Sequence, residues 1–167
     1  ATYCPRYWST FATEGVNIAS CTFFGHRECP DSLKSQLQEI LIDLITNHNI
    51  DMFYVGNQGR LDAIVRGVLQ GLKKEYPQIN YAVVLAYIPG KQNEYDDSDT
   101  MLPEGIESVH PRYAISWRNN WMLRQSDYVV TYITHSWGGA AQYAAKAARQ
   151  GKSVVNLADI ENDALEK

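Results

Sequence analysis

The sequence predicts an α/β protein, a Rossmann-like three-layer sandwich with a mainly parallel sheet of about five strands. Two observations favour this fold. Short apolar runs alternate with longer segments whose apolar residues recur at helical spacing, and glycine stands at three junctions where an apolar run gives way to a helix. The chain has 167 residues, enough for a domain with a substantial core. We therefore expect one domain over residues 18–167, preceded by an aromatic N-terminal extension over residues 1–17.

The first half of the chain contains three expected strands and two expected helices. Strands are predicted over residues 18–24, 51–55 and 79–88, because these runs are rich in β-branched, aromatic and other apolar residues. A helix should follow each of the first two strands, and Asp31 or Ser32 can cap the first helix. The apolar stripe of the first helix is Leu33, Leu37, Ile40, Leu41, Leu44 and His48, and that of the second is Leu61, Ile64, Val65, Val68, Leu69 and Leu72.

The second half of the chain begins with the longest irregular stretch, residues 89–110, which contains the acidic run EYDDSD at 94–99. This stretch is either a solvated loop or a lid over a site, since long loops in compact domains are often functional. After it we expect a helix over residues 113–124, a strand over 128–133, an alanine-rich helix over 138–148 and a strand over 153–157. Strands that alternate with helices favour a parallel sheet covered on both faces.

The composition excludes several classes of protein. Fifteen Lys and Arg residues against 19 Asp and Glu give a net charge of −4, so there is no general basic field to attract nucleic acid or an anionic membrane. No apolar run is long enough to span a bilayer, and the N-terminus lacks a signal-peptide pattern. Cys4, Cys21 and Cys29 show no CxxC spacing, so we expect a reduced, cytoplasmic protein without a disulfide framework or a metal site.

Three glycine-bearing junctions predict where a ligand binds. They are Gly25-His26-Arg27, Gly56-Asn57-Gln58-Gly59 and Gly138-Gly139-Ala140. In open parallel sheets, ligands bind outside the carboxyl ends of the strands, where the strand order reverses. Glycine lets the backbone approach a ligand closely, and the helix that follows presents free N–H groups and a partial positive charge. Three such junctions in one small domain favour a phosphate or ribose site.

The segment SWRNNWMLRQSD, at 116–127, adds charged and polar groups to this site. Arg118 is always charged and is a natural partner for a phosphate or carboxylate, and Asn119 lies beside it. The flanking Trp117 and Trp121 either pack in the core or form a contact between subunits.

Three other side chains near the junctions have two possible roles each. His26 either hydrogen-bonds a phosphate or braces its turn, and His135 is either an exposed loop residue or a ligand contact. Asp62 either favours the dipole of the second helix or hydrogen-bonds a ribose hydroxyl.

The order of these motifs resembles that of the SLOG superfamily, which includes the DprA-like proteins, the Lonely Guy phosphoribohydrolases and the YpsA-like proteins. The motifs are GHR at 25–27, G-x-x-G at 56–59 with Asp62 soon after, RNNWM at 118–122 and GGA at 138–140, and they are most similar to the YpsA-like branch. The resemblance covers roughly residues 18–157. It implies a Rossmann-like fold that binds nucleotides or nucleotide-derived sugars at the strand ends, and a homodimer or higher homo-oligomer.

The resemblance also bears on catalysis. Arg118 falls where the Lonely Guy enzymes have the catalytic arginine of their RK-x-x-M helix. Their GG-x-GT-x-x-E pattern ends in a glutamate, and Ala145 stands at that position in this sequence. Ala140 stands at the position of the threonine in the YpsA-like GGT pattern. Cleavage of an N-glycosidic bond needs a carboxylate near the developing oxocarbenium ion. The candidates for catalysis are therefore Arg118 together with Asp62 or Glu28.

The sequence thus favours a protein that binds a nucleotide-derived small molecule, an ADP-ribose-like or cyclic nucleotide signal, as a sensor or a sequestering protein without a cofactor. The alternative is a nucleotide N-glycosidase of the Lonely Guy type with an altered carboxylate. Binding of single-stranded DNA, as in the DprA-like relatives, is disfavoured by the acidic charge. The expected ligand-binding residues are Gly25, His26, Arg27, Gly56, Asn57, Gly59, Asp62, Arg118, Asn119, Trp137, Gly138, Gly139 and Ala140.

Overall fold

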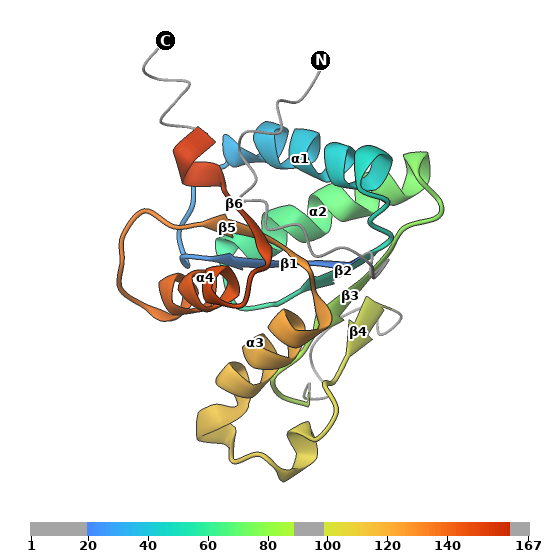
Figure 1. Cartoon of the computed structure of the whole chain (residues 1–167). Helices are drawn as coiled ribbons and strands as arrows, with labels where there is room; N and C mark the ends of the chain where they lie inside the picture. Colours follow the sequence, from blue (N-terminus) through green and yellow to red (C-terminus); the bar gives the residue numbers. More distant parts are fainter. Residues whose placement is uncertain (1–19, 89–98, 161–167) are drawn as a thin grey trace.

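The computed structural model describes residues 20–88 and 99–160, which form one parallel sheet with helices on both faces (Figure 1). The strand order is β4-β3-β2-β1-β5-β6. The strands are β1 (Ser20–Gly25), β2 (Met52–Val55), β3 (Asn80–Val84), β4 (Thr100–Met101), β5 (Tyr128–Tyr132) and β6 (Ser153–Asn156). The predicted Rossmann-like architecture is confirmed. The sixth strand is the short β4, which pairs with β3 at the sheet edge.

The helices cover the sheet in two pairs: α1 (Leu33–Asn47) with α2 (Arg60–Glu75) on one face, and α3 (Ala114–Gln125) with α4 (Gly139–Arg149) on the other (Figure 1). Residues of β1 alternate between the two layers. Cys21 and Phe23 pack under α1 and α2, whereas Phe24 packs against Met122 and Ala147 on the opposite side. This alternation follows from the two-residue period of a strand that is buried on both faces.

The predicted apolar stripes of the first two helices are buried, with two exceptions at their margins. His48 and Ile64 are only partly buried, and His48 lies against Tyr128, with its ring centroid 5.3 Å from the tyrosine ring. Ser32 stands at the N-terminal boundary of α1, but its side chain makes no capping hydrogen bond.

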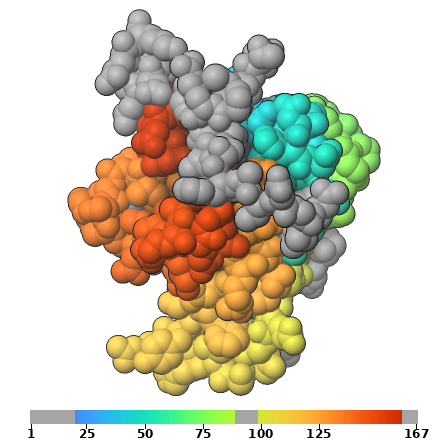
Figure 2. Space-filling model, in the orientation of Figure 1, coloured from blue at the N-terminus to red at the C-terminus, as the bar shows by residue number. Residues whose placement is uncertain are grey.

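The predicted irregular stretch 89–110 contains more structure than the sequence suggested. The expected strand 79–88 ends as β3 at Val84, and β4 and the short 3-10 helix η3 (Ile106–Ser108) follow. A second such helix, η4 (Pro111–Tyr113), leads into α3, and the segment with the two 3-10 helices forms the lower, yellow end of the molecule in Figure 2. Most of the acidic run and the predicted N-terminal extension lie outside the described residues. Both interpretations of this stretch, a solvated loop or a lid, therefore stay predictions.

The strand order reverses between β1 and β5. The chain adds β2, β3 and β4 on one side of β1, then returns to place β5 and β6 on the other side. Gly25 at the end of β1 is in register with Tyr132 at the end of β5. The carboxyl ends of these two strands thus form the crevice at which doubly wound sheets bind ligands.

Two further expectations concern thiols and membranes. Cys21 and Cys29 are free thiols, and Cys4 lies outside the described residues. No helix in the described part of the chain has the length and apolar character needed to cross a bilayer.

Candidate functional site

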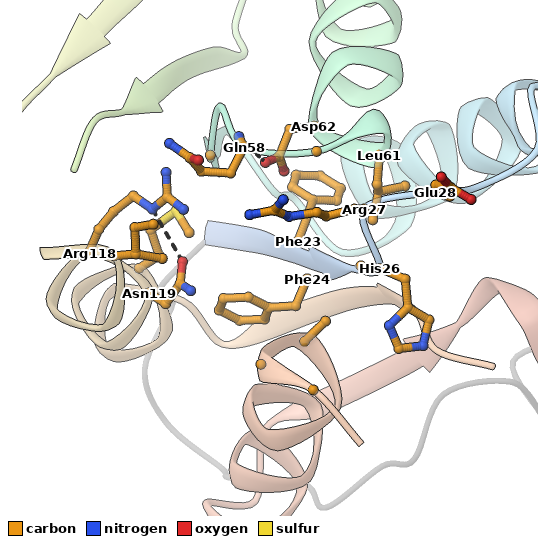
Figure 3. Close-up of a pocket in the computed structure, with 18 of the residues that line it drawn as sticks. Phe23, Phe24, His26, Arg27, Glu28, Gln58, Leu61, Asp62, Arg118 and Asn119 are labelled. Atoms are coloured by element: carbon orange, nitrogen blue, oxygen red, sulfur yellow. Dashed lines mark hydrogen bonds between the residues drawn. The ribbon is translucent and has the colours of Figure 1, made fainter. Parts of the chain in front are cut away.

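A cavity of about 620 Å³ opens at the carboxyl ends of β1, β2 and β5 (Figure 3). All three glycine junctions and one face of α3 contribute to its wall. Most of the residues expected at the site line this cavity, and so does the catalytic candidate Glu28. The expected residues in its wall are Gly25, His26, Arg27, Gly56, Gly59, Asp62, Arg118, Asn119, Gly138, Gly139 and Ala140. The structure thus brings together residues that are more than 100 positions apart in the sequence.

Arg118 is the most deeply buried charged group at this cavity, with 3% of its surface exposed. Its Nη1 donates to Oδ1 of Asn57 at 2.9 Å, and its Nε donates to Oδ1 of Asn119 at 3.2 Å. These partners are neutral amides, and within the described residues no carboxylate forms an ion pair with Arg118 and no hydrogen bond satisfies its Nη2.

Burial lowers the pKa of Arg118, and the charge of Asp62 opposes that shift. A guanidinium remains charged throughout the physiological range despite such a shift. A buried cation without a paired anion is energetically unfavourable unless something compensates its charge. The charge of Arg118 is therefore only partly compensated, by the nearby Asp62, and an anion in the cavity could compensate it further.

Asp62 lies in the first turn of α2, close to Arg118. Its Oδ2 accepts the backbone N–H of Gln58 at 3.0 Å, so the carboxylate stabilises the turn between β2 and α2. Burial raises the pKa of Asp62, while the Gln58 N–H and the charge of Arg118 oppose that rise. Both roles considered from the sequence therefore remain compatible with its position, because the same side chain caps the turn and lines the cavity.

Gly56 is needed where the β2–α2 turn passes these two side chains. A Cβ at this position would lie 2.9 Å from Oδ2 of Asp62 and 3.3 Å from Cζ of Arg118. Glycine thus lets the backbone lie directly against a carboxylate and a guanidinium at once.

His26 braces its turn, one of the two roles expected for it. Its Nε2 accepts the backbone N–H of Thr134 at 3.1 Å, which requires an unprotonated Nε2. Burial, and secondarily the neighbouring His135, lower the pKa of His26, which is consistent with a neutral ring. The brace ties the end of β1 to the loop after β5.

Three aromatic rings stack beside this brace. The ring of His135 lies 3.6 Å from that of His26 and 3.8 Å from that of Trp137, with interplanar angles of 15° and 18°. His26 and His135 line the cavity, whereas Trp137 does not and is 69% exposed. Trp137, which we expected at the ligand, lies outside the cavity wall and stacks on His135, so its contact with a ligand stays a prediction.

Two other residues expected at the site, Asn57 and Glu28, lie less favourably for contact with a ligand beside Arg118. Asn57 does not line the 620 Å³ cavity, although it hydrogen-bonds Arg118 and lines a smaller neighbouring cavity. Glu28 is exposed, and in Figure 3 it lies on the far side of Arg27 from Arg118. Its position makes Glu28 a poorer partner for Arg118 than Asp62 is.

The N-terminus of α4 faces the same cavity through Gly138 and Gly139. Gly138 has a φ of +96°, and no side chain caps the helix or places a carboxylate in its first turn. A Cβ at either glycine would meet no heavy atom within 4 Å, so the space in front of the helix is open. The partial positive charge of the helix end is therefore available to an anion.

Several lining residues were not predicted from the sequence: Phe23, Phe24, Gln58, Leu61, Ile115, Met122 and Thr134, and His135 had been left open. For Ile115 and Met122 a signal was present, because they stand three residues before and four residues after Arg118 and so share its helix face.

The fold and the site define a Rossmann-like α/β protein whose cavity, at the switch point of the sheet, is lined by the buried Arg118. Searches of protein-family models and of curated proteins find no match to this chain. Its membership of the SLOG superfamily therefore stays a prediction from the motifs.

Proposed function

We propose that the protein binds a nucleotide-derived small molecule, of the ADP-ribose or cyclic nucleotide kind, in the cavity between the ends of β1 and β5. The observation that carries this proposal is the guanidinium of Arg118, which is almost fully buried, unpaired by any described carboxylate and turned to a cavity. A phosphate would neutralise it and accept hydrogen bonds from its planar N–H groups.

The remaining groups fit a phosphate near Arg118. Arg27 is exposed at the cavity wall, and the N-terminus of α4 adds backbone N–H groups. The cavity of about 620 Å³ lies within the range of roughly 300–1,000 Å³ that is usual for small-molecule sites. The protein would act by sensing or sequestering the ligand.

The aromatic stack offers a surface for a base. Trp137 stacks on His135 and exposes 69% of its surface, so a base that reaches beyond the cavity wall can stack on its free face. Stacking between a base and an aromatic side chain contributes about 1–3 kcal/mol.

Isothermal titration calorimetry with AMP, ADP-ribose and cyclic AMP tests the proposal. We expect at least one of these to bind more tightly than millimolar, and Arg118→Gln to weaken its binding by tenfold or more. Arg124→Gln, at an exposed position of the same helix, is the matched control and should bind as the wild type does. The proposal fails if no nucleotide binds, or if both variants have the same effect.

A second candidate function is hydrolysis of a nucleotide N-glycosidic bond, favoured by the position of Asp62. Its pKa is raised by burial, and it lies at the cavity beside Arg118. A carboxyl group of raised pKa can protonate a leaving base and then take up the proton that water releases as its oxygen bonds to the sugar carbon. Chromatography of nucleotides incubated with the protein should then reveal free base, which Asp62→Asn should abolish. Intact nucleotides after long incubation exclude this function.

A further inference from the structure

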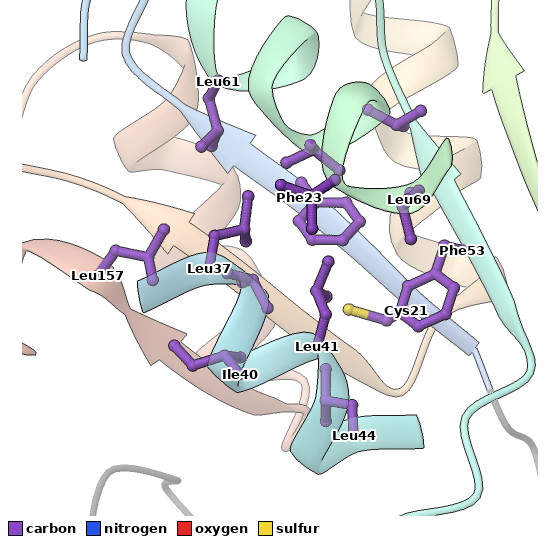
Figure 4. Packing of buried hydrophobic residues seen from close by; sticks show 14 of the residues in the cluster. Cys21, Phe23, Leu37, Ile40, Leu41, Leu44, Phe53, Leu61, Leu69 and Leu157 are labelled. Atoms are coloured by element: carbon purple, nitrogen blue, oxygen red, sulfur yellow. The ribbon is translucent and has the colours of Figure 1, made fainter. Parts of the chain in front are cut away.

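A second, smaller cavity of about 340 Å³ adjoins the proposed site on the other side of the β2–α2 turn. Its wall includes residues at one side of α2, namely Asp62, Ala63, Arg66, Gly67 and Gln70, whose spacing of three and four residues places them on one helix face. The opposite face of α2 carries Leu61 and Leu69 into the core, as Figure 4 shows. The helix therefore divides its surface between the core and this cavity.

The β2–α2 turn forms part of the wall of both cavities. They share Gly56, Gly59 and Asp62 in their walls. Asn57, from the wall of the smaller cavity, hydrogen-bonds Arg118, from the wall of the larger one, at 2.9 Å. A ligand that crosses this turn would thus contact both cavities, with its charged middle near Arg118.

The chemistry of the smaller cavity suits a polar group. Arg66 supplies a permanent cation, and the amides of Asn57 and Gln70 can each donate and accept hydrogen bonds. Asp62 is the one carboxylate among the described residues of its wall, and it also lines the larger cavity. Its volume is near the lower end of the usual range, roughly 300–1,000 Å³, so it fits a sugar or a phosphorylated sugar rather than a second nucleotide.

We propose that this cavity is a subsite for the second moiety of a two-part ligand, a nucleotide whose phosphate is joined to a further sugar. The inference rests on the proposed nucleotide binding and narrows it, because a plain mononucleotide would fill only the larger cavity. The ligand class is then a nucleoside diphosphate linked to a sugar, such as ADP-ribose.

Two glycines of α2 provide a matched pair for the test. Gly67 lines the smaller cavity and Gly71 lines neither cavity, and a Cβ at either position would meet no heavy atom within 4 Å. The variant Gly67→Phe should therefore fill the subsite, whereas Gly71→Phe makes the same change one turn further along the helix. Ala63→Phe, at an exposed position in the wall of the smaller cavity only, is a second way to fill it.

The measurement is the ratio of the dissociation constants for AMP and ADP-ribose, obtained by calorimetry on the full chain. We expect the wild type and Gly71→Phe to bind ADP-ribose at least tenfold more tightly than AMP. In Gly67→Phe and Ala63→Phe the ratio should fall below threefold while the affinity for AMP is kept.

The outcomes separate this inference from the proposed function. If AMP binds and the ratio is near one in the wild type, or is unchanged in both cavity-filling variants, the subsite is refuted and nucleotide binding stands. An equal loss of AMP and ADP-ribose in both variants also refutes it, because the change then acts on the larger cavity. If neither ligand binds to the wild type, both the proposed function and the subsite are refuted.

Discussion

Replacement of Gly56 by alanine tests the packing at the centre of the site without any assumption about the ligand. The added methyl group would lie 2.9 Å from Oδ2 of Asp62 and 3.3 Å from Cζ and Nη1 of Arg118. Both side chains are constrained, the first by the Gln58 N–H and the second by Asn57 and Asn119. They can move away only by breaking these hydrogen bonds.

The expected loss of stability follows from two opposing effects. Overpacking by a methyl group typically costs about 1–3 kcal/mol. Alanine also restricts the unfolded chain relative to glycine, which stabilises the protein by about 0.4–1 kcal/mol where the backbone conformation suits both residues. Gly56 is not among the glycines with positive φ, so this compensation applies. We therefore expect a net decrease of about 1–2 kcal/mol in the free energy of unfolding of Gly56→Ala.

Urea denaturation followed by circular dichroism measures this change, and Gly71→Ala is the control. A Cβ at Gly71 would meet no heavy atom within 4 Å, so that variant should gain about 0.5–1 kcal/mol from helix propensity. If Gly56→Ala proves as stable as Gly71→Ala, the close approach of the turn to Asp62 and Arg118 is refuted. Weakened nucleotide binding by Gly56→Ala should accompany its loss of stability.

Three further predictions concern titration and stacking. The raised pKa of Asp62 means that this carboxylate binds a proton more tightly in the folded state than in the unfolded state. The free energy of unfolding of the wild type should therefore fall relative to that of Asp62→Asn as the pH rises above 3.8. Parallel curves of this free energy against pH, from acid to neutral, would contradict the prediction. The pKa of His26 is lowered because protonation is disfavoured in the folded state, so the wild type should lose stability as the pH falls below 6.5. His26→Asn should lose less stability over the same pH range, and an equal dependence of the free energy of unfolding on pH, measured by urea denaturation, would refute the brace. Trp137→Ala should weaken nucleotide binding by about 1–3 kcal/mol and remove the ligand-induced change in tryptophan fluorescence, while Trp117→Phe, a change in a tryptophan that donates to the carbonyl of Glu104, should do neither.

The sequence predicted the fold well because its signals are local and repeated. The stripes that include Leu37 and Leu69 recur at helical spacing, and the strand around Phe23 is apolar on both faces. The two-residue β4 was missed because Thr100 and Met101 form too short a run to show a period. Their place in the sheet depends on pairing with Val83 and Val84, which lie far from them in the sequence.

The site was predictable in its backbone and less so in its side-chain contacts. Glycine at strand ends has a direct steric meaning, so the three junctions could be recognised. The stack of His135 on His26 could not, because it depends on how two loops more than 100 residues apart in the sequence meet. The burial of Arg118 was also hidden, since the surrounding sequence of α3 mixes tryptophans, amides and a second arginine without a clear apolar stripe.

The bond between His26 and the backbone of Thr134 has a consequence for how the protein assembles. It joins positions 108 residues apart, across the pair of strands β1 and β5 that links the two halves of the sheet. The first four strands with their two helices contain Arg27, Gly56 and Asp62, yet without β5 they lack the opposite wall. A nascent chain therefore gains its binding cavity only when β5 docks on β1, and a bound ligand should slow the separation of these two strands, which hydrogen exchange at Tyr132 and Thr134 would report.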